Sequence, residues 1–327
     1  MRRVRRPPSA PLRALHLGRI AAASLVLAAL AASAFLQAGV FVAVHDALAW
    51  LQVFPSLWNL LLAGLSSLSF GFLVVFALTL AFGRLYCSVL CPLGITQDGI
   101  FWVARRLGRK TSGYRRPLGA LRYGVLGLTI ALLAVGVPVA VDLLEPYSLF
   151  GRIVQNLVGP GLAYPLSRGV SAALEAVGVY VQPLAWHVSL AALVSTGALL
   201  ALLTALTVLR GRLYCNTLCP VGTALGLLSR FSRWAVVVDP GACTRCGRCV
   251  EVCPAECIDV EAGAVDASRC VSCFRCLSAC TFGALRYGRR RRGRLGSRAR
   301  VGGALVTASR RRFLHGAAGL GAGAGLA

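Results

Sequence analysis

Hydrophobic residues gather into four long uncharged runs along the chain. The runs cover residues 20–44, 57–82, 123–141 and 184–209. A helix needs about 20 apolar residues to cross a bilayer core, and lipid offers no partner for free backbone groups. The pattern therefore predicts a mainly α-helical membrane protein with four transmembrane helices.

The basic residues indicate how these helices are oriented. The chain has 35 Lys and Arg residues against 11 Asp and Glu residues, which gives a net charge of +24. If the amino end is cytoplasmic, the external segments 45–56 and 142–183 contain only Arg152 and Arg168 as basic residues. This asymmetry predicts a multi-pass protein of the bacterial inner membrane, with a cytoplasmic N-terminus. The charge is then a consequence of topology, and we expect no nucleic-acid partner.

Eight of the 13 cysteines form two runs with the same spacing, C-x2-C-x2-C-x3-C, in the polar segment after the fourth apolar run. This spacing is typical of bacterial two-cluster ferredoxins, in which the fourth cysteine of each run ligates the other cluster. We therefore expect two [4Fe–4S] clusters in a small α+β domain with short strands near 236–238, 258–260 and 284–287. The ligands expected for cluster one are Cys243, Cys246, Cys249 and Cys280, and those for cluster two are Cys270, Cys273, Cys276 and Cys253. Cys257 is expected to pack beside a cluster, as Ala284 does in the second run.

Four further cysteines lie in an internal repeat. Residues 83–94 read GRLYCSVLCPLG and residues 211–222 read GRLYCNTLCPVG, with nine of twelve positions identical. Each copy follows a predicted transmembrane helix, so the membrane part consists of two duplicated two-helix units.

The repeat predicts a redox or metal centre at the membrane edge, formed by Cys87, Cys91, Cys215 and Cys219. A helical turn would put the two sulfurs of each pair on one face, and the proline after each pair would then begin the next helix. A further iron–sulfur centre, another metal and a thiol–disulfide pair all remain open. Arg84 and Arg212, beside these motifs, are interpreted as positive-inside anchors rather than as groups that act on the thiols or on a quinone.

Together the motifs resemble the membrane polyferredoxin family of the NapH, NosR and CcoG (RdxA/FixG) types. The NapH type fits best, because the chain lacks the outer flavin-binding domain of NosR-like members and the immunoglobulin-like domain of CcoG-like members. The resemblance implies an electron-transfer subunit, as a quinol dehydrogenase component rather than a stand-alone enzyme, that works between the quinone pool and a redox partner protein. A copper-handling assembly factor for a respiratory oxidase and a redox-sensing regulatory membrane protein are the alternatives.

These features divide the chain into four parts. We expect a basic cytoplasmic N-terminus over 1–19, a four-span membrane domain over 20–234 and a cytoplasmic ferredoxin domain over 235–288. Residues 289–327 form a basic linker and an apolar tail that contains a twin-arginine-like motif.

Overall fold

The computed structural model describes residues 10–35, 39–63, 70–109, 113–136, 142–178 and 188–290. Contacts divide the chain into two compact units, Met1–Arg290 and Arg291–Ala327, and every described residue belongs to the first unit. The twin-arginine-like tail expected from the sequence therefore lies outside the described residues.

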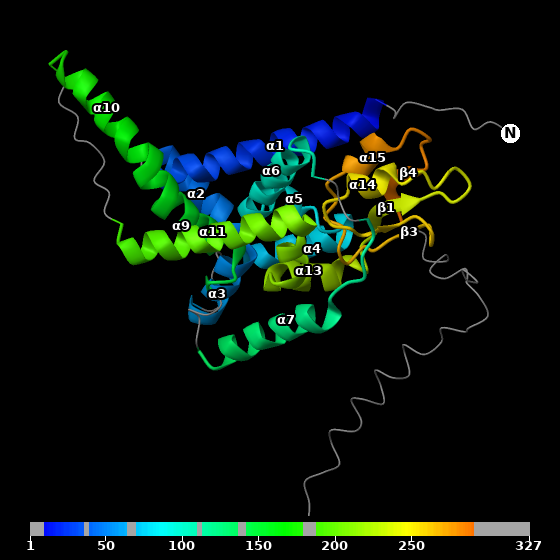
Figure 1. The fold of residues 1–327 in the computed structure, drawn as a ribbon. Coiled ribbons are helices and arrows are strands. Elements are labelled where there is room, and N and C mark those ends of the chain that lie inside the picture. Colours follow the sequence, from blue (N-terminus) through cyan, green and yellow to red (C-terminus); the bar gives the residue numbers. More distant parts are fainter. Residues whose placement is uncertain are drawn as a thin grey trace, which may run out of the picture. The chain divides into compact units, whose positions relative to one another are not determined.

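Most of the first unit is helical, as the hydrophobic runs predict (Figure 1). The helices are α1 (Ala10–Phe35), α2 (Gly39–Trp50), α3 (Val53–Ala63), α4 (Gly71–Phe82), α5 (Tyr86–Val89), α6 (Pro92–Arg106), α7 (Gly119–Ala134), α9 (Pro146–Ile153), the π-helix η2 (Val154–Ala163), α10 (Tyr164–Glu175), α11 (Leu190–Arg210), α12 (Leu213–Thr217), α13 (Pro220–Ser229), α14 (Arg248–Glu251) and α15 (Arg275–Ala279).

Two helices in the described part of the chain are long and apolar enough to cross a membrane. They are Arg13–Phe35 within α1 and Leu190–Arg210, which is α11. The run over 57–82 corresponds to two shorter helices, α3 and α4, with residues between them that are not described. The run over 123–141 corresponds to α7, which has 16 residues. The predicted count of four transmembrane helices is thus not confirmed.

The first helix also differs from the predicted run at both ends. Helix α1 begins ten residues before position 20 and ends at Phe35, and the separate helix α2 follows. The early start is physically reasonable because Arg19, which the hydrophobic pattern treats as a boundary, is buried and paired with Asp98. A neutralised arginine does not need to stay in water, so the helix continues through it.

The helices pack around the two repeats, whose residues lie in the largest of the buried clusters. Helix α1 packs along α2, α5 and α6, α11 packs against α6, and α13 packs against α4 and α7 (Figure 1). Val75, Leu93, Leu203 and Leu225 are almost fully buried in this core. It also contains all four cysteines of the repeats.

Four short strands form two antiparallel pairs in the ferredoxin segment. Strand β1 (Trp234–Val238) pairs with β4 (Leu285–Arg289), and β2 (Ile258–Asp259) pairs with β3 (Ala264–Val265). The three predicted strands are therefore confirmed, and β3 is an additional one. Helix α15 of this segment packs against α1, and β1 packs against α4.

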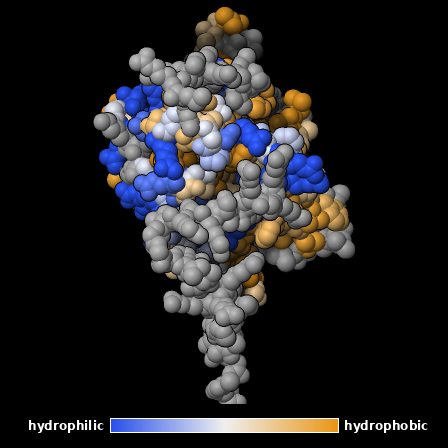
Figure 2. All heavy atoms as spheres, turned by 90° about the vertical axis from the view of Figure 1, so that its right-hand side faces the viewer, coloured by the Kyte–Doolittle hydropathy of each residue, from blue (hydrophilic) through white to orange (hydrophobic). Residues whose placement is uncertain are grey.

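The outer surface of the long helices is apolar. Large side chains such as Leu128 and Ile130 on α7 and Val194 and Leu202 on α11 are more than half exposed. Figure 2, viewed from the ferredoxin side, shows hydrophilic side chains gathered over part of that face and apolar ones toward its edges. Extensive apolar surface on helices favours contact with a membrane or a partner.

Candidate metal centres

Four cysteines line a cavity beside strands β1 and β4. Three come from the first cysteine run and one from the second, namely Cys243, Cys246, Cys249 and Cys280. Val238, Val260 and Leu285 complete an apolar wall. The structure thus brings together the four thiols expected for cluster one.

A second cavity contains the complementary set of thiols. Its lining includes Cys270, Cys273, Cys276 and, from the first run, Cys253. The apolar residues around it include Val236, Ile258 and Phe274. The exchange of one cysteine between the runs, which the spacing predicts, is therefore present in the geometry.

The two loops that carry these thiols have the same unusual backbone. Arg245 and Ser272 precede the second cysteine of each run, and both have a positive φ, of 56° and 51°. Gly247 and Phe274 follow that cysteine, with φ values of 77° and 61°. Left-handed conformations are costly for residues other than glycine. Their repetition at equivalent positions bends both loops so that successive cysteines face one cavity.

Cys257 is a fifth thiol at the second cavity. It is buried, and its Sγ lies 3.6 Å from the Sγ of Cys253. A hydrogen bond from Cys257 lowers the pKa of Cys253 to about 7 and also lowers the pKa of Cys270. Ala284 lines the first cavity. Both residues lie beside the cavities, as the sequence comparison of the two runs predicts.

Two ligand thiols, Cys249 and Cys273, favour the protonated form in the absence of metal. Burial raises the pKa of Cys249 and of Cys273 to about 11. Thiolates are the metal ligands, so cluster assembly must release these protons.

Each cavity fits a four-iron cluster better than a single ion. In the ranges that the structure covers, no three His, Cys, Asp or Glu side chains converge closely enough to hold one metal ion. A [4Fe–4S] cluster is held by four thiolates around a larger volume, so its ligands need not meet at a point. Four thiols around an apolar cavity match that requirement.

The two repeats fold in the same way after α4 and α11. Gly83 and Gly211 end these helices with a positive φ, of 76° and 59°. A short helix then carries the first cysteine of each pair, and the second cysteine adopts an extended conformation as the N-cap of the next helix. Pro92 begins α6 and Pro220 begins α13, which confirms the predicted role of the prolines. The two sulfurs of a pair are therefore not on one continuous helical turn.

The four thiols of the repeats are deeply buried in one core. Cys87, Cys91, Cys215 and Cys219 are each no more than 4% exposed, and Cys273 of the second cavity packs in the same core. Burial raises the pKa of Cys215 to about 11 and raises those of Cys91 and Cys219. The repeat thiols thus lie next to the second cavity.

Each repeat donates an arginine to the other. Arg212 Nη1 donates to the carbonyl oxygen of Cys87 at 2.7 Å, and Arg84 Nη2 donates to the carbonyl oxygen of Cys215 at 3.1 Å. Both arginines are fully buried. The sequence-based interpretation of these arginines as positive-inside anchors is therefore wrong. Their guanidinium groups join the two repeats.

Glycine makes these contacts possible. A Cβ atom on Gly94 would lie 2.2 Å from the Cys87 carbonyl oxygen, and one on Gly222 would lie 2.2 Å from that of Cys215. The same Cβ atoms would also lie close to the arginine of the other repeat. The Gly94 Cβ would be 3.1 Å from Arg212 Nη1, and the Gly222 Cβ would be 3.0 Å from Arg84 Nη2. Only a residue without a side chain fits beside both the carbonyl and the arginine.

Asp98 connects three separate parts of the core. It accepts hydrogen bonds from Arg19 Nη2 at 2.8 Å and from Arg212 Nε at 3.2 Å. Arg212 Nη2 also forms an ion pair with the Asp98 carboxylate, at 2.8 Å. Burial opposes ionisation of Asp98, but Arg212, Arg275 and Arg19 together hold its pKa below the usual range. One carboxylate thus serves two buried guanidinium groups.

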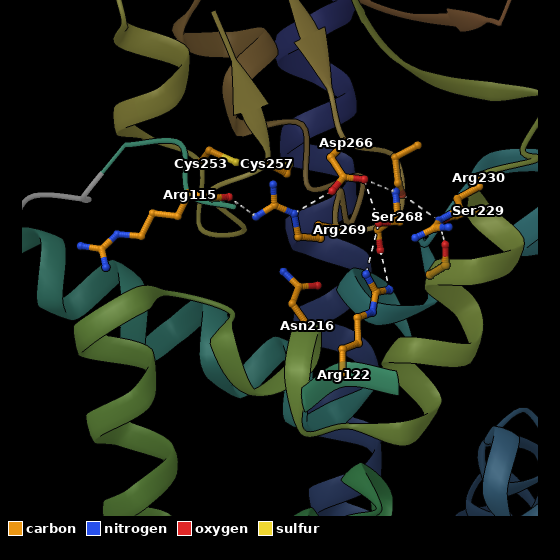
Figure 3. Close-up of polar contacts among 12 residues, drawn as sticks. Arg115, Arg122, Asn216, Ser229, Arg230, Cys253, Cys257, Asp266, Ser268 and Arg269 are labelled. Carbon is orange, nitrogen blue, oxygen red and sulfur yellow. Dashed lines mark hydrogen bonds and ion pairs between the residues drawn. The ribbon is translucent and has the colours of Figure 1, made fainter. Parts of the chain in front are cut away.

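Two more buried arginines reach the ferredoxin segment, and no carboxylate of the described residues lies within hydrogen-bond range of them. Arg84 Nη1 and Arg122 Nη2 both donate to the carbonyl oxygen of Ser268, at 3.0 Å and 2.9 Å. Arg84 also donates to Asn216 Oδ1 and to Cys87 Sγ. Figure 3 shows the Arg122 guanidinium pointing at Ser268, next to Asp266. These contacts are to neutral groups, so the positive charge of Arg84 lies unneutralised beside the thiols.

This charge suits an anionic occupant. Buried cations are costly unless they are paired. Four thiolates give a cubane cluster a net negative charge, and nearby charge and hydrogen bonds to sulfur set its potential. The residues around the repeat thiols and the second cavity therefore fit iron–sulfur clusters.

Comparisons with known proteins agree with this chemistry. A family model described as a 4Fe-4S binding domain matches residues 64–110 and 192–237, and one described as a 4Fe-4S dicluster domain matches residues 235–281. The chain is accordingly a ferredoxin-type protein with iron–sulfur binding domains, a class that transfers electrons. More narrowly, these matches and the relatives named below support the NapH-like polyferredoxin family.

Relatives that share these segments are ferredoxin-type proteins. The chain is 32% identical over 209 residues to "Methylamine utilization ferredoxin-type protein MauN" of Methylobacillus flagellatus, which covers 62% of this chain and 61% of the relative. It is 29% identical to MauN of Paracoccus denitrificans over 65% of this chain and 59% of the relative. It is 26% identical to "Ferredoxin-type protein NapH" of Haemophilus influenzae over 52% and 47%. The matched region thus spans about half to three fifths of these relatives, and no solved structure matches the chain significantly.

Sequence reasoning missed the acidic residue and misjudged the arginines of the site. Asp98 lies outside the twelve-residue repeat and has no acidic counterpart in the second copy, where Gly226 occupies the equivalent position. Arg84 and Arg212 are identical in both copies, as are Gly94 and Gly222. Their repetition beside the cysteines was the available signal for a role within the site.

Proposed function

We propose that this chain is a membrane-bound electron carrier that relays electrons between the quinone pool and a redox partner protein. The observation that carries the proposal is that neighbouring thiol sets share buried cores. The two cavities of the ferredoxin segment collect four and five thiols, and the repeat thiols pack beside the second cavity. Bound clusters in these places would supply a series of one-electron carriers close together.

The ligand assignment follows from the cavities. Cluster one would be held by Cys243, Cys246, Cys249 and Cys280, and cluster two by Cys253, Cys270, Cys273 and Cys276. Ile258 and Leu277 are almost fully buried in the same core, so the chain keeps water from most of the second cavity. Cys257 is left as a neighbour that donates to two ligands of cluster two.

A third cluster at Cys87, Cys91, Cys215 and Cys219 is part of the proposal. Two observations support it, since both matched segments of the 4Fe-4S binding domain contain one cysteine pair, and the arginines joining the repeats surround the thiols with positive charge. Electrons arriving from the helices would then reach the repeat thiols before the ferredoxin segment.

We further propose the four-span topology, with the N-terminus and the ferredoxin domain on the cytoplasmic side of a bacterial inner membrane. The domain division at 1–19, 20–234, 235–288 and 289–327 belongs to the same proposal. Its support is the distribution of basic residues and the apolar outer faces of α4, α7 and α11.

Copper handling is the second candidate function. The specific observation in its favour is that four buried thiols lie apart from the two ferredoxin cysteine runs, and thiolates are good ligands for Cu(I). The repeat thiols would then bind copper while the ferredoxin segment supplies electrons.

One experiment separates these functions. The full chain is purified in detergent, reconstituted anaerobically, and analysed for iron, sulfide and copper. We expect roughly twelve irons per chain, four for each cubane, and about eight in the C87S/C215S variant. Cys257→Ala serves as the matched thiol control and should keep the full iron content. About eight irons together with stoichiometric copper that the double variant loses would favour copper handling.

The quinone connection is tested on the same preparation. A menaquinol analogue is added anaerobically while cluster reduction is followed by EPR. We expect reduction in the wild type and its loss in C87S/C215S. The quinone relay would be contradicted if dithionite reduces the intact clusters but the quinol analogue leaves them oxidised at every quinol-to-quinone ratio.

A further inference from the structure

A cleft rich in arginine lies between the second repeat, the segment before α7 and the ferredoxin loop. Its charged lining residues are Arg115, Arg116, Arg210, Arg212, Arg269 and Glu256. No cysteine lines this cleft, so it is separate from the proposed cluster sites.

Two of these arginines already have carboxylate partners. Arg212 pairs with Asp98 at 2.8 Å, and Arg269 pairs with Asp266 at 2.8 Å. Of the other three, Arg210 lies 3.9 Å from Glu256, and Arg115 also acts electrostatically on that carboxylate. The lining therefore contains more guanidinium groups than carboxylates.

The cleft also contains hydrogen-bond donors without acceptors. Arg269 donates through Nε to Asp266 and through Nη1 to the Arg115 carbonyl oxygen, but its Nη2 has no hydrogen-bond partner. The side chain of Arg269 is only 6% exposed, so solvent does not replace that partner. Nε of Arg210 is buried and likewise has no hydrogen bond. Figure 3 shows the Arg269 guanidinium held between Asp266 and the backbone of Arg115, with Asn216 pointing toward it.

The cleft lies at the C-terminal end of one apolar helix and at the N-terminal end of another. Helix α11 ends at Arg210, and α7 begins at Gly119, directly after the lining residues 115–118. Helix α11 is long and apolar enough to cross a membrane. If it does, the end of the helix lies at the depth of the lipid phosphates, where basic pockets between helices bind anionic headgroups.

We propose that this cleft binds a phosphate-type anion, and that the phosphate is the headgroup of an anionic phospholipid. Guanidinium groups match phosphate oxygens in geometry and charge. Arg269 and Glu256 belong to the ferredoxin segment, whereas Arg115, Arg116 and Arg210 belong to the helical part. A phosphate held among them binds the two parts together, which is a role beyond electron transfer.

The test uses the full holoprotein in a neutral detergent. Short-chain phosphatidylglycerol, phosphatidylcholine of the same chain length and inorganic phosphate are titrated separately, and bound ligand is followed by native mass spectrometry. The site variant is R116Q/R210Q. The control is R106Q/R286Q, which removes the same charge from two exposed arginines outside the cleft.

We expect saturable phosphatidylglycerol binding that the site variant weakens roughly 25-fold, because each basic residue contributes about fivefold to binding of anionic lipid. The control should change binding less than threefold. Glu256→Gln should tighten binding, since it removes the carboxylate that competes with the ligand. A gain of affinity cannot arise from misfolding, and unchanged cluster absorbance confirms that the variants are folded.

The outcomes distinguish the source of the phosphate. Inorganic phosphate that shows the same variant pattern without preference for phosphatidylglycerol would assign the site to free phosphate and overturn the lipid assignment. Equal losses in the site and control variants, or no tightening by Glu256→Gln, would overturn the site itself. None of these results depends on quinol oxidation.

Discussion

Replacing Asp98 with asparagine removes the carboxylate that two buried arginines share. Arg19 comes from α1, Arg212 from the start of the second repeat, and Asp98 from α6. The substitution keeps the size of the side chain but leaves both guanidinium groups without a counterion. The contact therefore tests whether charge, rather than shape, joins the three segments.

The expected cost is large because every partner is buried. The side chains of Arg19, Asp98 and Arg212 are 4%, 7% and 1% exposed. Removing one member of a buried ion pair typically costs about 3–5 kcal/mol, chiefly because a charge remains buried and unpaired. Arg19 keeps a bond to the Ser88 carbonyl oxygen, and Arg212 keeps its bond to Cys87, so the two losses should not add fully. We expect the free energy of unfolding to fall by about 4 kcal/mol.

The effect depends on pH in a defined direction. The pKa of Asp98 is lower in the folded protein than its ordinary value, so its ionised form stabilises the fold. This stabilisation is fully present above the unfolded value of about 3.9 and is lost as the pH falls through the folded value. The difference between the wild type and Asp98→Asn should therefore be constant near pH 7 and shrink below about pH 4.

Thermal unfolding of the detergent-solubilised holoprotein, followed by far-UV circular dichroism, measures the effect. A loss of about 4 kcal/mol should lower the Tm by roughly 6 °C for a chain of this size. Asp46→Asn is the matched control, because Asp46 is exposed on α2 and its substitution should cost less than about 0.5 kcal/mol. A Tm for Asp98→Asn within 2 °C of the control would refute the assignment of this ion pair as a major contact.

Three further predictions concern the thiol sites. Gly94→Ala should destabilise the fold by at least about 1–3 kcal/mol, because its Cβ would lie 2.2 Å from a backbone oxygen. The control Gly99→Ala, on the same helix, has open space around its Cβ and should stabilise the fold by up to about 1 kcal/mol. Thermal unfolding measures both effects. Iron analysis should show the loss of about one cluster in Cys253→Ala and none in Cys257→Ala. Arg84→Gln should make the reduction potential of a centre at the repeat thiols more negative by on the order of 100 mV. The reason is that a unit charge a few Å away contributes roughly 2–4 kcal/mol at an effective dielectric constant of about 20. An EPR-monitored redox titration that shows no shift would contradict this prediction.

The ferredoxin thiols could be predicted because their geometry is local. Three cysteines within seven residues must lie close together in any fold, and the two runs repeat the same spacing and the same left-handed turns. The fourth ligand follows from the ferredoxin pattern rather than from the residues alone. The prolines after Cys91 and Cys219 were also predictable, since their missing N–H groups and fixed φ suit the first turn of a helix.

The ion pairs could not be predicted because their partners are far apart in the chain. Arg19 and Asp98 are 79 residues apart, and Asp98 and Arg212 are 114 apart. A hydrophobicity pattern assigns Arg19 to the end of a run because it registers the charge and not its partner. The same limitation applies to the run over 57–82, where composition alone does not distinguish one long helix from the shorter α3 and α4.

The exchange of arginines explains why the duplicated motif contains more than its cysteines. Each arginine binds the backbone of the first cysteine in the other copy, so neither thiol pair can move without the other. The glycine two residues after each proline leaves room for this contact. Arg84 then extends the connection to Ser268, two residues before Cys270 at the second cavity. One pair of repeated side chains thus fixes the four repeat thiols together, connects them to the ferredoxin segment and places positive charge where anionic clusters would be bound.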